Sequence, residues 1–139
     1  MNLYYDDGNS SISLLVQGPY IVYCYFNVSS KDVYKIKELY GEESWIKSKP
    51  IIIAYEETKE KEVKIYEEYI DPFADNWFIT LDRCNIQVLV KLCRKLENGT
   101  ILPIATSNKV TTLTDKESSN NKVKFIKVIE SIQDKIYSY

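Results

Sequence analysis

The chain has 139 residues, 45% of them hydrophobic and 27% charged, and these proportions are those of one globular domain. Its 18 basic and 20 acidic residues leave a net charge of −2, so it lacks the positive charge that attracts nucleic acid. Histidine is absent, which removes the commonest general base and the commonest zinc ligand. The four glycines form neither a dinucleotide-binding motif nor a P-loop.

The compartment is predicted from the N-terminus and the cysteines. No basic region followed by an apolar run opens the chain, and the longest apolar runs are far shorter than the ~20 residues of a membrane span. The three cysteines form no Cys-x-x-Cys pair, which favours reduced thiols and a cytoplasmic location. Cys24 and Cys93 lie in apolar, strand-like runs and are expected to be buried, whereas Cys84 lacks a histidine to act as its base.

The N-terminal part of the chain predicts a flexible lead-in over residues 1–9, a strand over 11–17 and a Gly18-Pro19 turn. Residues 20–28 form the strongest predicted strand, because aromatic and β-branched residues fill it. One face of this strand is apolar and is predicted to lie in the core: Val22, Cys24, Phe26 and Val28. The other face is largely aromatic with polar tips and suits a surface or a groove: Ile21, Tyr23, Tyr25 and Asn27.

A short helix is predicted over residues 30–40, with Ser29 or Ser30 as its N-cap and Gly41 at its end. Beyond it, the sequence predicts four further segments: a polar loop over 44–49 that carries Trp45, a buried strand over 50–55, a charged hairpin tip over 56–62 and a strand over 63–70.

The next predicted strands cover residues 77–81 and 85–96. Asn98-Gly99 is a pair preferred in type I′ turns, so a strand over 100–106 should fold back on the one before it. A last short strand is predicted over 109–113.

The C-terminal part consists of a polar linker over residues 114–121 and a predicted amphipathic helix over 122–137. The apolar positions of this helix recur at spacings of three and four: Phe125, Ile126, Ile129, Ile132 and Ile136. Two interpretations stay open. The apolar stripe packs on its own domain, or it contacts a partner or a second copy in a dimer.

Together these elements predict a mainly β protein. We expect an immunoglobulin-like or fibronectin-like antiparallel β-sandwich over residues 10–113, with one short inserted helix. Residues 114–139 would add the linker and the C-terminal helix.

No recognisable catalytic or metal-binding constellation is present. The three cysteines have no zinc-site spacing, and no serine has a histidine partner. The paired carboxylates lie in charged, solvated segments: Glu42-Glu43, Glu56-Glu57 and Glu67-Glu68. We therefore expect a non-catalytic protein without metal or cofactor.

The twelve tyrosines carry the only functional signal, and they have two explanations. Tyrosine favours strands, but tyrosine and tryptophan also dominate binding surfaces. Tyr23 and Tyr25 should project from one strand face about 7 Å apart, close to the size of a hexose ring. Trp77 is a third candidate, although its neighbours favour a place in the core. Glycans and proteins are the expected ligand classes, and a protein partner would use the C-terminal helix and a sheet edge.

Three segments together resemble the domain of unknown function 4912 family: Ser11–Val28, Asp75–Ile79 and Gly99–Asn108. The first is similar to the family's opening, which runs through Asp-Pro-Tyr to Tyr-Trp-Glu. Here Gly18 replaces the acid, Phe26 the tryptophan and Asn27 the glutamate. The second resembles its central Trp-Tyr motif, and the third its closing Gly-x-x-x-Pro-Leu-x-x-Ser-Asn signature.

The resemblance covers about residues 10–113 and implies an all-β fold with no established activity, so no catalytic residue is carried over. It also implies an accessory or carbohydrate-binding role near α-glucan metabolism.

Overall fold

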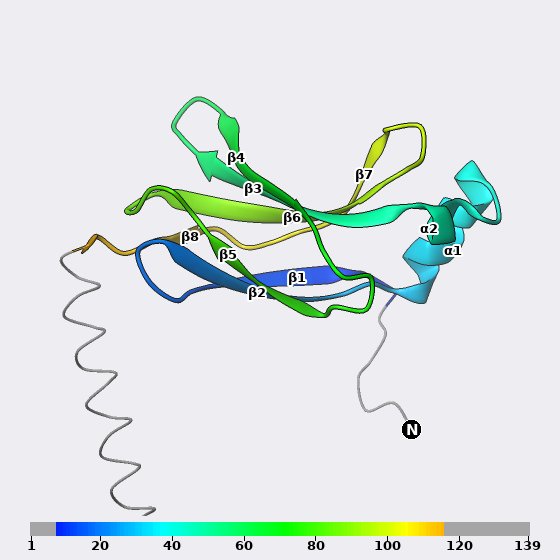
Figure 1. Cartoon of the computed structure of the whole chain (residues 1–139), viewed down its shortest axis with the longest axis horizontal. Coiled ribbons are helices and arrows are strands. Elements are labelled where there is room, and N and C mark those ends of the chain that lie inside the picture. Colours follow the sequence, from blue (N-terminus) through cyan, green and yellow to red (C-terminus); the bar gives the residue numbers. More distant parts are fainter. Residues whose placement is uncertain (1–7, 116–139) are drawn as a thin grey trace, which may run out of the picture.

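The computed structural model describes residues 8–115, which fold into two antiparallel β-sheets with two helices at one end (Figure 1). The eight strands, in chain order, are β1 Ser11–Val16, β2 Ile21–Asn27, β3 Lys49–Glu57, β4 Glu62–Tyr69, β5 Asn76–Thr80, β6 Gln87–Lys95, β7 Ile101–Thr106 and β8 Val110–Thr111. The helices are α1 Ser30–Tyr40 and α2 Ser44–Lys47. The prediction of a mainly β protein with antiparallel sheets is confirmed.

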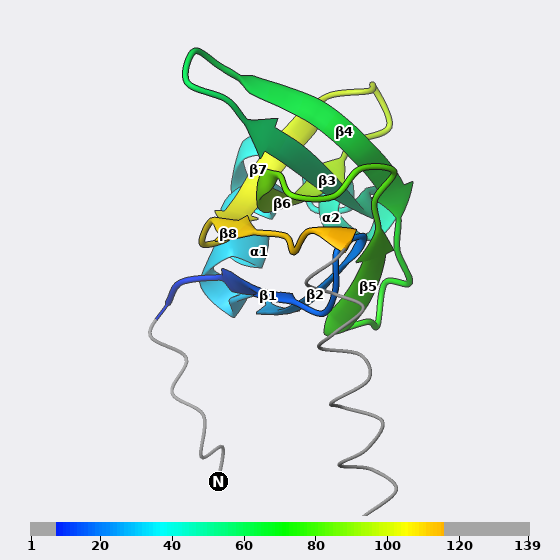
Figure 2. The ribbon, with the colours of Figure 1, turned by 90° about the vertical axis from the view of Figure 1, so that its left-hand side faces the viewer.

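The strands divide into two layers. The first sheet has the order β1-β2-β5. The second has the order β4-β3-β6-β7, and the short strand β8 also pairs with β6. Figure 1 shows the three-stranded sheet below the five-stranded one, and Figure 2 shows the same two layers from the side.

The hydrophobic core lies between the sheets, because each inner strand places alternate side chains inward. Val22 and Cys24 of β2 are fully buried, as the period of two in this strand predicted. Their counterparts on the five-stranded sheet include Ile52 of β3 and Val90 of β6. The opposite face of β2 therefore points away from the core.

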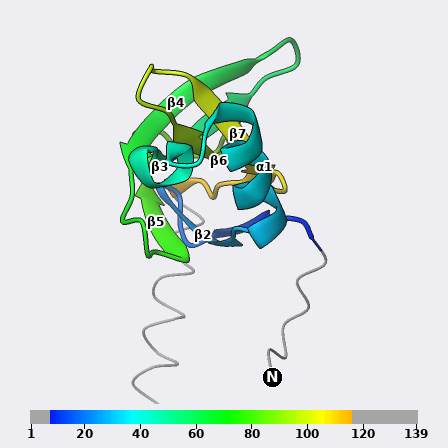
Figure 3. The ribbon, with the colours of Figure 1, turned by 90° about the vertical axis from the view of Figure 1, so that its right-hand side faces the viewer.

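Helix α1 forms where its capping residues predicted it. The Ser29 Oγ accepts a hydrogen bond from the Asp32 N–H at 3.1 Å, and Gly41 ends the helix with φ +114°. Ile36 is the residue of this helix that is buried. Figure 3 shows α1 and α2 lying across one end of the two layers.

The prediction of a polar loop over residues 44–49 is wrong, because residues 44–47 form helix α2. Its single turn is held locally, since the Ser44 Oγ donates to the Gly41 carbonyl at 2.6 Å and Lys47 pairs with Glu43 at 2.9 Å. Its Trp45 ring lies 3.6 Å from the guanidinium carbon of Arg94 on β6. This contact between distant parts of the chain cannot be predicted from local propensity.

The β3–β4 hairpin is longer than the sequence predicted. The strands continue into the charged segment, so the tip comprises only residues 58–61 and is closed by a hydrogen bond from the Thr58 N–H to the Lys61 carbonyl at 3.0 Å. The strand predicted over 109–113 is shorter, because β8 consists of Val110 and Thr111.

Strands β6 and β7 pair as predicted, but their turn has a different geometry. Gly99 has φ +89°, whereas Asn98 does not adopt the left-handed region that a type I′ turn requires. The Gly99 N–H donates to the Leu96 carbonyl at 2.9 Å, and the Leu96 N–H donates to the Thr100 carbonyl at 2.8 Å. This is a three-residue hairpin loop with a glycine bulge.

The described chain ends beside the three-stranded sheet, where the Tyr20 hydroxyl donates to the Asp115 carboxylate at 2.7 Å. The predicted C-terminal helix and a dimer through it lie outside the described residues. Across residues 8–115, no helix has both the length and the apolar character needed to cross a membrane.

Candidate functional site

The outer face of the three-stranded sheet exposes a contiguous apolar surface, which we call the aromatic face. It consists of Leu15, Ile21, Tyr23, Tyr25 and Phe78. All five project away from the core, since they alternate with buried residues along their strands. Four of them are substantially exposed, including Tyr25 at 49% and Phe78 at 62%.

The pairing register brings these side chains together. Leu15 of β1, Tyr23 of β2 and Phe78 of β5 are direct cross-strand neighbours in one row. The Tyr23 ring lies 4.7 Å from the Phe78 ring and 6.4 Å from the Tyr25 ring, measured between centroids. The interplanar angles are 43° and 35°, so the three rings are adjacent but tilted against one another.

Polar side chains border one end of the aromatic face. Tyr25 lies between Ser13 of β1 and Asn76 of β5 in the next row of the sheet. Further along the strand, the Ser11 hydroxyl donates to the Asn27 side-chain carbonyl. These hydroxyl and amide groups can exchange hydrogen bonds with a polar ligand that lies on the rings.

The three-stranded sheet carries no charged residue. The sequences of β1, β2 and β5 are SISLLV, IVYCYFN and NWFIT. In contrast, the strands of the five-stranded sheet contain several lysines and glutamates. The aromatic face therefore suits an uncharged ligand.

The structure brings two of the three predicted site residues together. Tyr23 and Tyr25 share the aromatic face, but Trp77 pairs with Cys24 and packs half-buried against the core on the opposite side of the sheet. The third aromatic ring of the site is Phe78, which was not among the site residues predicted from the sequence. Its signal was the alternation in β5, where Trp77 and the buried Ile79 share one face and Phe78 lies on the other.

Cys24 and Cys93 are buried free thiols, as predicted. Burial raises the pKa of each to about 11, which keeps both protonated at neutral pH. Among residues 8–115, no group of three His, Cys, Asp or Glu side chains is arranged to hold a metal ion.

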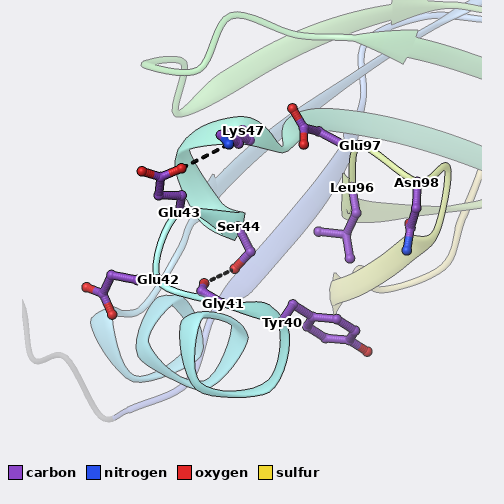
Figure 4. Close-up of a pocket in the computed structure, with 9 residues that line it drawn as sticks. All are labelled: Tyr40, Gly41, Glu42, Glu43, Ser44, Lys47, Leu96, Glu97 and Asn98. Atoms are coloured by element: carbon purple, nitrogen blue, oxygen red, sulfur yellow. Dashed lines mark hydrogen bonds and ion pairs between the residues drawn. The ribbon is translucent and has the colours of Figure 1, made fainter.

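An open cleft of about 620 Å³ lies between the helices and the β6–β7 hairpin. Glu43 is paired with Lys47, and Ser44 is bonded to the Gly41 carbonyl (Figure 4). Glu42 points away from the hairpin side, where Tyr40 and Leu96 lie. The carboxylates that line the cleft, those of Glu42, Glu43 and Glu97, do not converge on a common point. The cleft therefore offers no acid–base pair for catalysis.

Ser107 and Asn108, which follow β7, connect the two sheets. Ser107 exchanges hydrogen bonds with Val90 of β6, through its backbone and its hydroxyl, each at 2.8 Å. The Asn108 side chain accepts from the Leu14 N–H at 2.8 Å and donates to the Leu14 carbonyl at 3.0 Å. The Ser-Asn pair therefore connects the two sheets, because Asn108 is bonded to β1 of one sheet and Ser107 to β6 of the other.

The fold and this face define a mainly β domain with two antiparallel sheets, one of which has an open aromatic surface. The chain belongs to the family described as Domain of unknown function (DUF4912), whose model matches residues 8–123. The family resemblance is thereby confirmed, and Ser107-Asn108, in one of the segments that carried the resemblance, has the structural role described above. Comparison with the curated proteins finds no match to the chain.

Proposed function

We propose that this domain is a non-catalytic binding module that holds a neutral glycan, with α-glucan as the first candidate, on the aromatic face. The observation that carries the proposal is the group of three adjacent rings on an uncharged sheet, of which Tyr25 and Phe78 are exposed and Tyr23 between them is half-buried. Sugar rings stack on aromatic faces through their apolar C–H groups, while their hydroxyls need polar neighbours. Ser13 and Asn76 beside Tyr25 supply such neighbours.

The absence of charge on the three strands favours a glycan over a nucleic acid, because a base-stacking surface is normally accompanied by cations that contact phosphates. A non-catalytic role is supported by the lack of histidine in the sequence and by the carboxylates of the 620 Å³ cleft, which do not converge. The three free cysteines support a cytoplasmic location.

For the fold, we propose a fibronectin-like sandwich. The order β1-β2-β5 in one sheet and β4-β3-β6-β7 in the other supports it, together with the shared core.

A protein-binding adaptor is the second candidate. Within residues 8–115, β5 has no strand on its outer side, so its backbone can pair with an extended peptide next to Phe78. A peptide strand there would also contact the aromatic face.

The test is the double substitution Tyr23→Ala with Tyr25→Ala, measured by α-glucan pull-down and titration calorimetry. Each ring contributes about 1 kcal/mol or more to stacking, so the double variant should bind at least about tenfold more weakly. Trp77→Phe is the matched control, because it changes an aromatic residue on the opposite side of the same sheet. Unchanged glycan affinity in a folded double variant would contradict the proposal.

A further inference from the structure

The outer face of the five-stranded sheet concentrates positive charge around Tyr69. Lys49 of β3 lies directly opposite Lys95 of β6 in the pairing register. The Nζ atom of each lysine lies 5.7 Å from the centroid of the Tyr69 ring. Two ammonium groups from different strands therefore flank the same side chain.

Neither Lys49 nor Lys95 forms an ion pair with a carboxylate within residues 8–115, although the charge of Glu67 on β4 is close enough to contribute to the raised pKa of Lys95. The Glu67 carboxylate forms its ion pair with Lys64, at 2.9 Å, and not with Lys49 or Lys95. Because like charges directly opposite each other destabilise a sheet, this pair costs stability that a bound anion would restore.

The site is held by regular structure. Beneath the lysine stems lies a small cluster of buried side chains on the outer face of the sheet, formed by Ile51, Ile53 and Cys93. Tyr69 itself is 49% exposed, so a ligand can reach it. A hydrogen bond that the Lys95 ammonium donates to the Tyr69 hydroxyl oxygen raises the pKa of Lys95, so this lysine is charged at neutral pH.

We propose that Lys49 and Lys95 bind the phosphate group of a small phosphomonoester beside Tyr69. Two ammonium groups match the two negative charges of a phosphomonoester at neutral pH, and each can donate charge-assisted hydrogen bonds to its oxygens. The site is on the opposite sheet from the aromatic face, so the proposal does not depend on glycan binding there.

The experiment is an amide chemical-shift titration of the ¹⁵N-labelled full chain with inorganic phosphate and with glucose 6-phosphate, using glucose as the neutral counterpart. The variant is Lys49→Gln with Lys95→Gln. The matched control is Lys59→Gln with Lys61→Gln, which removes the same charge from the β3–β4 hairpin tip of the same sheet.

Saturable shifts at residues 49, 69 and 95 are expected with both phosphates and not with glucose. The dissociation constant should rise at least about tenfold in the Lys49–Lys95 variant and stay unchanged in the hairpin control. If phosphate affinity falls equally in both variants, or if the shifts are linear and spread over all lysines, phosphate binds only through non-specific electrostatic attraction. Either result would overturn the proposal. If the double variant does not fold, the single Lys95→Gln variant gives the same comparison, with a smaller expected loss.

Discussion

Asn108 illustrates how one exposed loop residue can determine the assembly of two sheets. Its side chain satisfies both backbone groups of Leu14, a residue in the middle of β1 whose N–H and carbonyl face away from β2. An unpaired backbone group next to the core carries a desolvation cost, so the amide acts as a substitute for a neighbouring strand.

Substituting Asn108→Ala should lower the free energy of unfolding by about 1–3 kcal/mol, since two hydrogen bonds to a partly buried backbone are lost. Asn108→Asp keeps the acceptor for the Leu14 N–H and loses the donor to its carbonyl, so it should also destabilise. Chemical denaturation measures both. Asn76→Ala is the control, because the hydrogen bond of its side chain goes to the exposed Asp75. Equal stability of the Asn108→Ala variant and the control would contradict the inter-sheet role.

The buried thiols give a second prediction. With folded pKa values near 11, Cys24 and Cys93 should resist a thiol reagent at pH 8, whereas the partly exposed Cys84 should react first. The unfolded-state pKa is near 9, so the native state holds these protons more tightly. Their contribution to stability is therefore complete below about pH 9 and is lost as the pH rises toward 11.

Labelling followed by mass spectrometry of peptides checks the order of reaction. A Cys84→Ser variant should show almost no labelling at pH 8 until denaturant is added. Rapid labelling of Cys24 in the native protein would contradict its burial.

Among the elements, the strands were predicted best, because β-branched and aromatic residues alternate over enough positions to fix both the period and the face. In β2 this alternation correctly assigned the core residue Cys24 and the outward residues Tyr23 and Tyr25. The site could be predicted only in part. The alternation in β5 separates Phe78 from Trp77, but the position of Phe78 beside Tyr23 depends on the β2–β5 register, which is a long-range pairing. The turn at Asn98-Gly99 was predicted in place but not in geometry, since one dipeptide is compatible with several loop lengths.

Helix α2 could not be predicted from the sequence, because it depends on tertiary contacts. Its four residues have no cooperative helical stability of their own, and the stack of Trp45 on Arg94 is a tertiary contact. Arg94 is 8% exposed and donates hydrogen bonds to the carbonyl and the hydroxyl of Ser48, the residue after the helix. Burial lowers the pKa of Arg94 to about 10, so the side chain stays charged at neutral pH.

Trp45→Ala should therefore destabilise the protein by about 2 kcal/mol, through lost burial and the lost cation–π contact with a desolvated cation. Its neighbour Ile46 is 80% exposed on the same helix, so Ile46→Ala is expected to change stability by less than about 0.5 kcal/mol. Thermal and urea unfolding of the two variants give the comparison. Similar losses in both would mean that α2 is held by something other than this stack.

At the scale of the whole molecule, the two sheets present opposite surfaces. The three-stranded sheet is uncharged and exposes aromatic rings. The five-stranded sheet instead exposes lysines that lie over tyrosine rings: Lys49 and Lys95 over Tyr69, and Lys91 over Tyr55 at 4.7 Å from the ring centroid. A shared core fixes the faces on opposite sides of one rigid unit, so two ligands could be held at once without competing.

This separation predicts different responses to salt. Between about 0.1 M and 1 M NaCl the Debye length falls from ~10 Å to ~3 Å, which weakens contacts between exposed charges and leaves ring stacking almost unchanged. Glycan affinity should therefore stay within about twofold, while the affinity for inorganic phosphate should fall at least about fivefold. Calorimetric titrations of the same protein sample at both salt concentrations would measure the two responses. A glycan affinity that falls in parallel with that of phosphate would place the sugar on the charged sheet, because the aromatic face has no charge for salt to screen.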